Sequence, residues 1–289
     1  MKKILILKSE NYEFVRSLDD CDIDNYYNSK YNADSKFLIL LRKLKIKPNL
    51  IFFSNWKNKI KKYDEIIFFD NGYNEVFSYW VKKINPYCKT ILWIWNPINS
   101  RHIRFFKDKN LDEIYTYNEK EASKYGIKYN TQFYNKEFKE KILQINDSEK
   151  YDIVFLGRNK NRKSIIDNFE KEIEKYGLKT NFKIIENDEK EISYYEYLNL
   201  INRSKAILDI VNDVHQGLTL RAMETIFLNK KLVTNNLEVM NHKFYNKDNF
   251  FILGVDNIEN IVEFINSPYK NIDSTIINYY EFEKWLLRF

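Results

Sequence analysis

The stretch AILDIVNDVHQGLTLRAMETIFLNKKLVTNN, residues 206–236, places a glycine and a carboxylate between two apolar runs. Its hydrophobic pattern predicts a strand over 207–210, a turn at Gly217, a helix over 218–228 and a second strand over 232–234. A strand, a helix and a strand in this order form a parallel crossover unit. The stretch therefore predicts an α/β fold with a parallel sheet.

The loop before this helix has the chemistry of an anion site. Unpaired backbone N–H groups at 217–219 (Gly217, Leu218 and Thr219) and the positive end of the helix dipole favour an anion such as a diphosphate. Gln216 adds a side-chain amide. Glu224 lies seven residues beyond Gly217, so about two helical turns return it to the same face, where a carboxylate can accept hydrogen bonds from a ribose diol. The alternative is that Glu224 pairs with a surface lysine.

A second glycine precedes a basic cluster in DIVFLGRNKNRK, residues 152–163. The pattern predicts a strand, a turn at Gly157 and the start of a helix. Arg158 can bind phosphate oxygens in bidentate fashion and Lys163 can act as a point charge, so together they can balance the charge on a departing nucleoside diphosphate. A solvated basic turn explains the same residues. Gly157 and Gly217 both follow predicted strands at the sheet edge where α/β proteins bind ligands, so we expect one shared site.

The same alternation extends along the chain of 289 residues. Strands are predicted in the first half at 4–7, 50–53, 65–69, 90–95, 113–117 and 129–133, with helices at 35–44, 74–84 and 119–125. After a polar helical segment at 135–150, further strands are predicted at 152–156, 182–185, 206–210, 232–234 and 250–253. We therefore predict two Rossmann-like domains, 1–147 and 148–289, facing each other across a cleft, with an amphipathic helix over 274–289 crossing back.

Composition narrows the class of protein. A hydrophobic content of 44% and an aromatic content of 17% argue against disorder. The net charge of +6 is compatible with phosphorylated ligands, but residue bias along the whole chain explains it equally well. Two cysteines give no disulfide framework, and no apolar run approaches the length of a membrane span. We expect a soluble cytoplasmic protein.

The first half offers one candidate general base. Asp70 follows the predicted strand 65–69 and can remove a proton from an acceptor hydroxyl if it lies within hydrogen-bond range. The alternative is that Asp70 and the following Asn-Gly only form a turn. His102 can do the same chemistry, but a histidine just inside a helix start is usually structural. His215, beside Gln216, is a further candidate for the donor site, and it is too isolated to belong to a metal site.

The motifs around Gly157 and Gly217 resemble the carboxyl-terminal domain of GT-B-fold glycosyltransferases, including bacterial lipopolysaccharide and capsular polysaccharide enzymes. In that family a Gly-Arg and a following Lys contact the donor diphosphate, and two glutamates in a spaced pattern hold the donor. By this resemblance, Gln216 stands at the first glutamate position and faces the transferred sugar, 217–218 contacts the phosphates, and Glu224 contacts the ribose. The resemblance covers residues 151–256. The glycine-rich loop that many relatives carry after the first strand is missing.

Two further patterns bear on cofactors and partners. Asp20, Asp22 and Asp24 formally match the Asp-any-Asp metal pattern of the other large glycosyltransferase fold, but they do not follow an apolar strand. With Arg158 and Lys163 available to neutralise a diphosphate, we expect no metal and no other cofactor. The segment 40–62 carries eight lysines and arginines around three aromatic residues, so it is a candidate for peripheral contact with an anionic membrane. A solvated surface explains it equally well.

The sequence thus predicts a metal-independent glycosyltransferase that moves a sugar from a nucleotide diphosphate sugar to a surface glycan or lipid-linked acceptor. Asp70 and Gln216 are the catalytic candidates. Two alternatives remain open: a nucleotide-sugar epimerase of the same fold, and a non-catalytic protein that binds sugar nucleotides. No basic-aromatic signature concentrates on one predicted element, so we expect no nucleic acid partner.

Overall fold

The computed structural model describes residues 2–9, 15–28, 40, 50–143, 150–186, 192–212 and 217–289. The predicted helix over 35–44 lies outside the described residues except at Leu40. The chain divides into two compact units, which are Met1–Asn130 with Phe289 and Thr131–Arg288. Contacts place the segment from Thr131 onward with the second unit, earlier in the chain than the boundary expected near 148.

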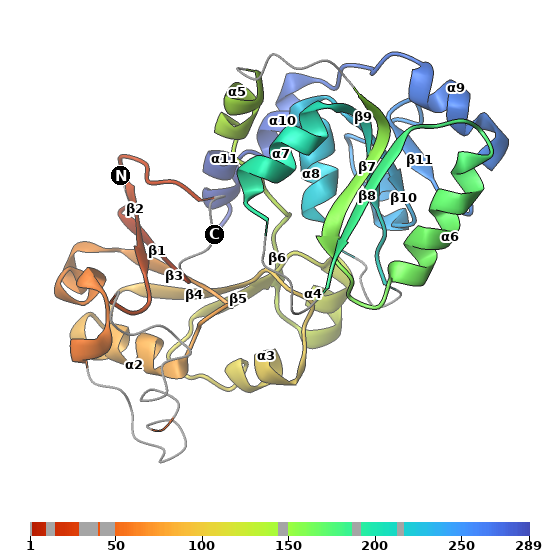
Figure 1. The fold of residues 1–289 in the computed structure, drawn as a ribbon. Coiled ribbons are helices and arrows are strands. Elements are labelled where there is room, and N and C mark those ends of the chain that lie inside the picture. The colour runs from red at the N-terminus through yellow and green to blue at the C-terminus, as the bar shows by residue number, and fades with distance from the viewer. Residues whose placement is uncertain are drawn as a thin grey trace. The chain divides into compact units, whose positions relative to one another are not determined.

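The first unit is a six-stranded sheet in the order β2-β1-β3-β4-β5-β6, and all of its strand pairs are parallel (Figure 1). The strands are β1 (Ile4–Lys8), β2 (Cys21–Asn25), β3 (Glu65–Phe69), β4 (Lys89–Ile94), β5 (Glu113–Thr116) and β6 (Lys128–Tyr129). The helices are α2 (Glu75–Ile84), α3 (Ser100–Phe105) and α4 (Glu119–Tyr125), with three 3₁₀ turns, η1 (Leu50–Phe52), η2 (Asn55–Asn58) and η3 (Ile60–Lys62).

The helix ends of the first unit follow their local sequence. The Asn74 side chain accepts a hydrogen bond from the Val76 amide and caps α2, and Asn118 caps α4 in the same way. Gly126 ends α4 in the left-handed conformation, with φ of 64°, which glycine adopts without strain. The predicted helices at 74–84 and 119–125 are confirmed.

In the first unit one predicted strand was wrong, and one strand was missed. The run 50–53 is not a strand but the 3₁₀ turn η1, and the polar segment CDIDN forms the edge strand β2. A short apolar run cannot be assigned from periodicity alone, and an edge strand needs little apolar sequence. Asp24 helps to hold the end of β2 beside η2, because its carboxylate accepts hydrogen bonds from the Ser54 hydroxyl and the Trp56 amide.

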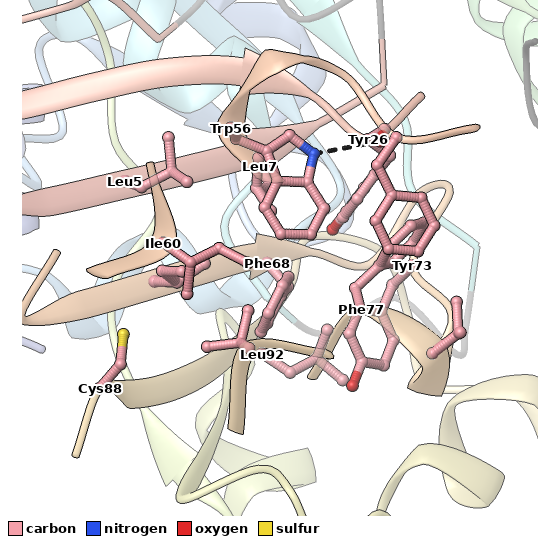
Figure 2. Packing of buried hydrophobic residues seen from close by; sticks show 14 of the residues in the cluster. Leu5, Leu7, Tyr26, Trp56, Ile60, Phe68, Tyr73, Phe77, Cys88 and Leu92 are labelled. Atoms are coloured by element: carbon pink, nitrogen blue, oxygen red, sulfur yellow. Dashed lines mark hydrogen bonds between the residues drawn. The ribbon is translucent and has the colours of Figure 1, made fainter. Parts of the chain in front are cut away.

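Aromatic side chains fill the core between the sheet and α2 (Figure 2). The Trp56 indole N–H donates to the Tyr26 carbonyl oxygen at 3.1 Å, and the Tyr26 and Phe77 rings stack at 4.6 Å between centroids. Phe52, Phe53 and Trp56 are all buried. These are the rings that the membrane hypothesis for 40–62 needed at the surface, so only the lysines of that hypothesis remain available. Its basic residues at 42, 43, 45 and 47 lie outside the described residues.

The second unit is a parallel five-stranded sheet in the order β11-β10-β9-β7-β8 (Figure 1). Its strands are β7 (Tyr151–Arg158), β8 (Thr180–Ile185), β9 (Ser204–Asp209), β10 (Lys231–Thr234) and β11 (Phe250–Ile252). Its helices are α5 (Glu137–Leu143), α6 (Lys163–Glu174), α7 (Tyr194–Asn202), α8 (Leu220–Leu228), α9 (Ile261–Asn266), α10 (Ser274–Tyr279) and α11 (Phe282–Leu286), with the 3₁₀ turns η4 (Leu237–Asn241) and η5 (Ile258–Asn260).

This strand order locates the functional edge of the second unit. Helices α6 and α9 pack on one face of the sheet, while α7 and α8 lie on the other (Figure 1). The chain runs from β7 outward to β8 and then returns to β9 on the other side of β7. The carboxyl ends of β7 and β9 therefore form the switch point at which open α/β sheets bind ligands.

The end of the chain differs from the single helix predicted over 274–289. It forms two short helices, α10 and α11, because Glu281 adopts an extended backbone conformation, with φ of −70° and ψ of 143°. The Tyr134 amide donates to the Tyr280 carbonyl oxygen at 2.9 Å, and the Phe282 amide donates to the Tyr134 carbonyl oxygen at 3.0 Å. Phe289 belongs to the first unit, where its ring meets Tyr115 at 4.8 Å between centroids.

Among the described residues, no helix combines the length and apolar character needed to cross a lipid bilayer.

Candidate functional site

Two arginines cluster at the carboxyl end of β7. The guanidinium carbons of Arg162 and Arg221 lie 5.0 and 4.9 Å from the centroid of the Phe155 ring. Arg162 Nη1 donates to the Ile210 carbonyl oxygen at 2.6 Å, and Arg221 Nη2 donates to the Leu156 carbonyl oxygen at 2.7 Å. Stacking on one ring and bonding to the backbone hold both guanidinium groups beside the switch point.

Gly157 makes room for this pair. A Cβ atom at position 157 would lie 2.6 Å from Arg221 Nη2 and 3.0 Å from Arg162 Nη2. The glycine is part of strand β7, which continues to Arg158, so the predicted turn at 157 was wrong. The absence of a side chain at Gly157 lets the two arginines approach the backbone closely, which is a common reason for glycine in a strand.

Further positive charge surrounds the pair. Burial lowers the pKa of Lys160, and the charges of Arg162, Arg221 and Arg158 lower it further. Burial and the Arg221 charge also lower the pKa of Arg162, to about 10. Lys160 and the following residue, Asn161, both adopt left-handed backbone conformations, with φ of 45° and 62°. A bound anion would offset the mutual repulsion of these cations, so the cluster has the electrostatics of a phosphate site.

The predicted cations Arg158 and Lys163 both contact Glu186. Arg158 Nη1 is 3.5 Å from the Glu186 carbonyl oxygen, and Lys163 Nζ is 3.5 Å from Glu186 Oε1. The Lys163 side chain is 54% exposed, as suits a flexible point charge at the start of α6. The Lys163 contact is at the long limit, so this cation can turn toward a ligand at little cost.

Hydrogen bonds within the second unit hold the loop before α8 in place. Thr219 caps the helix, accepting a hydrogen bond from the Ala222 amide at 3.3 Å and donating to Asp209 Oδ2 at 2.8 Å. The helix therefore begins at Leu220 and not at 218 as predicted. Leu218 is buried, and the Gly217 carbonyl oxygen accepts a hydrogen bond from Asn236 Nδ2 at 2.9 Å. His215 and Gln216 lie outside the described residues, so their predicted roles stay predictions.

Glu224 lies in a buried hydrogen-bond network. It is 1% exposed, and its two carboxylate oxygens accept hydrogen bonds from the Tyr194 hydroxyl at 2.9 Å and the Tyr197 hydroxyl at 2.6 Å. The Tyr134 hydroxyl lies 2.8 Å from that of Tyr194. The network joins α7, α8 and the segment before α5. Because Glu224 is 1% exposed, contact with a ribose, as the resemblance implies, would require the side chains that cover it to move. The alternative of a surface lysine partner is not what this structure shows.

Burial of Glu224 predicts a pH dependence of stability. Burial raises the pKa of Glu224 to about 7, although hydrogen bonds from Tyr197 and Tyr194 and the Arg221 charge oppose the shift. A carboxyl with a raised pKa holds its proton longer in the folded than in the unfolded state. The folded state therefore loses stability as pH rises from about 4.5 to about 7, by on the order of 3 kcal/mol.

We expect Glu224→Gln to remove most of this dependence. Urea unfolding of the variant and the wild type near pH 5 and near pH 8 checks it: the stability of the variant relative to wild type should rise between the two pH values. Glu172→Gln, at an exposed position of α6, is the matched control and should not change the profile. Parallel pH profiles for Glu224→Gln and wild type would contradict the expected titration.

Asp70, the predicted general base, connects the loop after β3 to the loop after β4 through hydrogen bonds. Its carboxylate accepts hydrogen bonds from the Trp95 amide at 3.2 Å and Asn96 Nδ2 at 3.0 Å, and His102 Nε2 lies 3.1 Å away. The Asn99 amide donates to His102 Nδ1 at 3.1 Å, so the neutral tautomer with its proton on Nε2 fits both contacts. With Asp70 only 3% exposed, this geometry favours the turn interpretation, and its catalytic role stays a prediction.

The Asp-any-Asp pattern has internal partners. Asp22 accepts hydrogen bonds from Lys62 Nζ at 2.8 Å and the Tyr63 hydroxyl at 2.6 Å, while Asp24 holds Ser54 and the Trp56 amide. Within the part of the chain that the structure describes, no three histidine, cysteine or acidic side chains are grouped as metal ligands.

Sequence reasoning missed three residues of the cation cluster, which are Lys160, Arg162 and Arg221. The first two stood in the basic motif 157–163 without an assigned role. Arg221 could have been found from the sequence, because a cation in the first turn of a helix is unfavourable next to the helix dipole and therefore usually binds a negatively charged group. Its carboxylate neighbour Asp209, 3.6 Å away at Oδ1, lies at the end of β9 and is fully buried.

No family model matches the chain, and no curated protein matches it. Among solved structures, the chain is similar to an alpha-glucosyltransferase in complex with UDP and a 13-mer DNA containing a central A:G mismatch. The TM-score is 0.57 at 10% sequence identity, and the match covers 99% of this chain and 94% of that chain. At this identity the similarity shows the fold. The predicted architecture of two α/β domains, each built on a parallel Rossmann-like sheet as in GT-B glycosyltransferases, is confirmed.

Proposed function

We propose that the chain is a glycosyltransferase that takes a sugar from a nucleoside diphosphate sugar and passes it to a glycan or lipid-linked acceptor. The observation that carries this proposal is the cluster of Arg158, Lys160, Arg162 and Arg221 at the switch point of the second unit. A leaving diphosphate brings the negative charge that such a cluster stabilises. The structural neighbour was solved with UDP, which supports a uridine nucleotide as the first ligand to test.

In this proposal the cations stabilise the leaving group without a metal. The arginines beside Phe155 are already fixed by backbone carbonyls, so they need little reorganisation when charge develops on the diphosphate. Lys163 would swing from Glu186 to the terminal phosphate. Gln216 would face the sugar, as the resemblance implies, and Asp70 remains the candidate base on the first unit.

Ligand-induced stabilisation tests the donor site directly. We expect UDP to raise the melting temperature of the protein, because a ligand at a hundred times its Kd stabilises the folded state by about 2.7 kcal/mol. Adenosine, guanosine and cytidine diphosphates serve as the comparison series. Uridine, which lacks the diphosphate, shows how much of the shift depends on the phosphate groups. If none of the four diphosphates shifts the melting temperature, the proposal fails.

Product analysis then separates the proposal from its alternatives. With a labelled sugar nucleotide alone, an epimerase would convert the donor, while a transferase would need an acceptor. Binding without turnover over a full acceptor series would indicate a non-catalytic protein. The complex of the structural neighbour contains DNA, so the expectation that this chain has no nucleic acid partner lacks support, and the series should include DNA oligonucleotides beside glycans.

A further inference from the structure

The first unit contains a polar cavity that the donor-site motifs do not use. It has a volume of about 480 Å³, within the range of small-molecule sites, and it opens where strand β2 ends and the turn η2 begins. Because β1, β2, β3 and β4 run parallel, this is the carboxyl edge of the sheet, where α/β proteins bind ligands. We propose that this cavity binds a sugar residue that carries a carboxylate or a phosphate group.

Amide side chains dominate the lining. Asn25, Asn55 and Asn58 contribute amides, and a fourth comes from Asn28. Among the described residues, the side-chain amide of Asn25 has no hydrogen-bond partner, and the side-chain amides of Asn55 and Asn58 bond only to each other, from Asn58 Nδ2 to Asn55 Oδ1 at 3.2 Å. The cavity thus offers donors and acceptors at several points. Sugar hydroxyls both donate and accept, so they match this inventory better than an apolar ligand does.

Lys57 gives the cavity its charge. Its Nζ atom donates to the carbonyl oxygens of Ile51 at 3.3 Å and Phe53 at 3.0 Å, so one of its three N–H groups is left to donate to a ligand. Within the described part of the chain no carboxylate pairs with Lys57, and none lines the cavity. An anionic substituent on the sugar would supply the missing partner.

This inference rests on the proposed function for its meaning, since a sugar site on the first unit would hold the acceptor. The cavity itself is tested without transfer. Saturation-transfer NMR measures the affinity of the whole protein for glucuronic acid, glucose 6-phosphate and methyl glucoside, which represent a carboxylate, a phosphate and a neutral sugar. A DNA oligonucleotide is the fourth probe.

We expect the charged sugars to bind more tightly than methyl glucoside, and the tighter of the two identifies the anionic group. Asn25→Ala should weaken all three sugars about five- to tenfold, the effect of one lost hydrogen bond. Lys57→Met should remove the advantage of the charged sugars, while Lys61→Met, at an exposed position of the neighbouring turn η3, should leave every affinity unchanged.

Affinities that Asn25→Ala leaves at the wild-type value would overturn the proposal, as would equal losses in the Lys57 and Lys61 variants. Binding of the DNA probe, but of no sugar, with loss in Asn25→Ala would overturn it in favour of a nucleic acid site. Because Lys57 also bonds two backbone carbonyls, Asn25→Ala decides the case if Lys57→Met does not fold. The UDP-induced thermal shift of each variant separates a failed cavity from a failed donor site, because the donor site belongs to the second unit.

Discussion

Replacing Arg221 with methionine is expected to lower the free energy of unfolding by about 3–5 kcal/mol. The Arg221 guanidinium lies 3.6 Å from the fully buried carboxylate of Asp209, and it also donates to the Leu156 carbonyl oxygen. Removing the cation leaves a buried carboxylate without its counter-charge, which is among the costliest changes in a protein interior. Urea unfolding at neutral pH measures the loss. Arg104→Met, on the exposed side of α3, should change stability by less than about 0.5 kcal/mol.

The double variant Arg221→Met with Asp209→Asn tests the cause. If the loss comes from the stranded carboxylate, the asparagine removes its charge and the double variant regains much of the stability, since contacting residues are not additive. Thr219 and Thr234 can continue to donate to the oxygen of an asparagine at 209. A double variant no more stable than Arg221→Met would show that the loss comes from the packing of Arg221 on Phe155 instead.

The sequence predicted the second unit better than the first for a physical reason. Its central strands are buried on both faces and so are continuous apolar runs, as at 206–210, and they stand out without any tertiary information. In the first unit, CDIDN is an edge strand with polar side chains, while the apolar run 50–53 is a turn that fills the core. Both errors arise because apolar character reports burial, and a short buried segment is not necessarily a strand.

The structure of the site differs from the prediction where a residue's surroundings depend on distant neighbours. Gly157 was expected to form a turn, yet it lies in strand β7, where two arginines pass close to it, and one of these comes from α8. Glu224 was expected to contact a ribose, which stays a prediction, and the structure adds two tyrosines of α7 as its hydrogen-bond donors. Spacing within one helix gives the face of a residue, but it does not show which element covers that face. The position of both motifs at the carboxyl ends of strands was predictable, because it needs only the order of strand and loop.

Gly157→Ala is expected to weaken UDP binding by a factor on the order of 10 to 100 while the protein remains folded. The new methyl group would lie 2.6 Å from Arg221 Nη2 and 3.0 Å from Arg162 Nη2, so at least one guanidinium must shift. Side-chain ends can move, which preserves the fold, but a shift breaks the bond to the Leu156 or Ile210 carbonyl oxygen that aims the cation. A charge-assisted hydrogen bond to phosphate is worth about 1.5–3 kcal/mol, and each 1.4 kcal/mol is a tenfold change in affinity.

Isothermal titration calorimetry at fixed ionic strength measures this loss, and thermal unfolding shows that the variant is folded. Lys163→Met is the comparison, because it removes a whole charge that is exposed and held only at 3.5 Å from Glu186. If the buried pair is the main phosphate anchor, one added methyl group at 157 weakens UDP more than loss of the Lys163 charge does. The opposite order would place the diphosphate at the start of α6, over Arg158 and Lys163, and would make the arginine pair on Phe155 a structural element of the sheet edge.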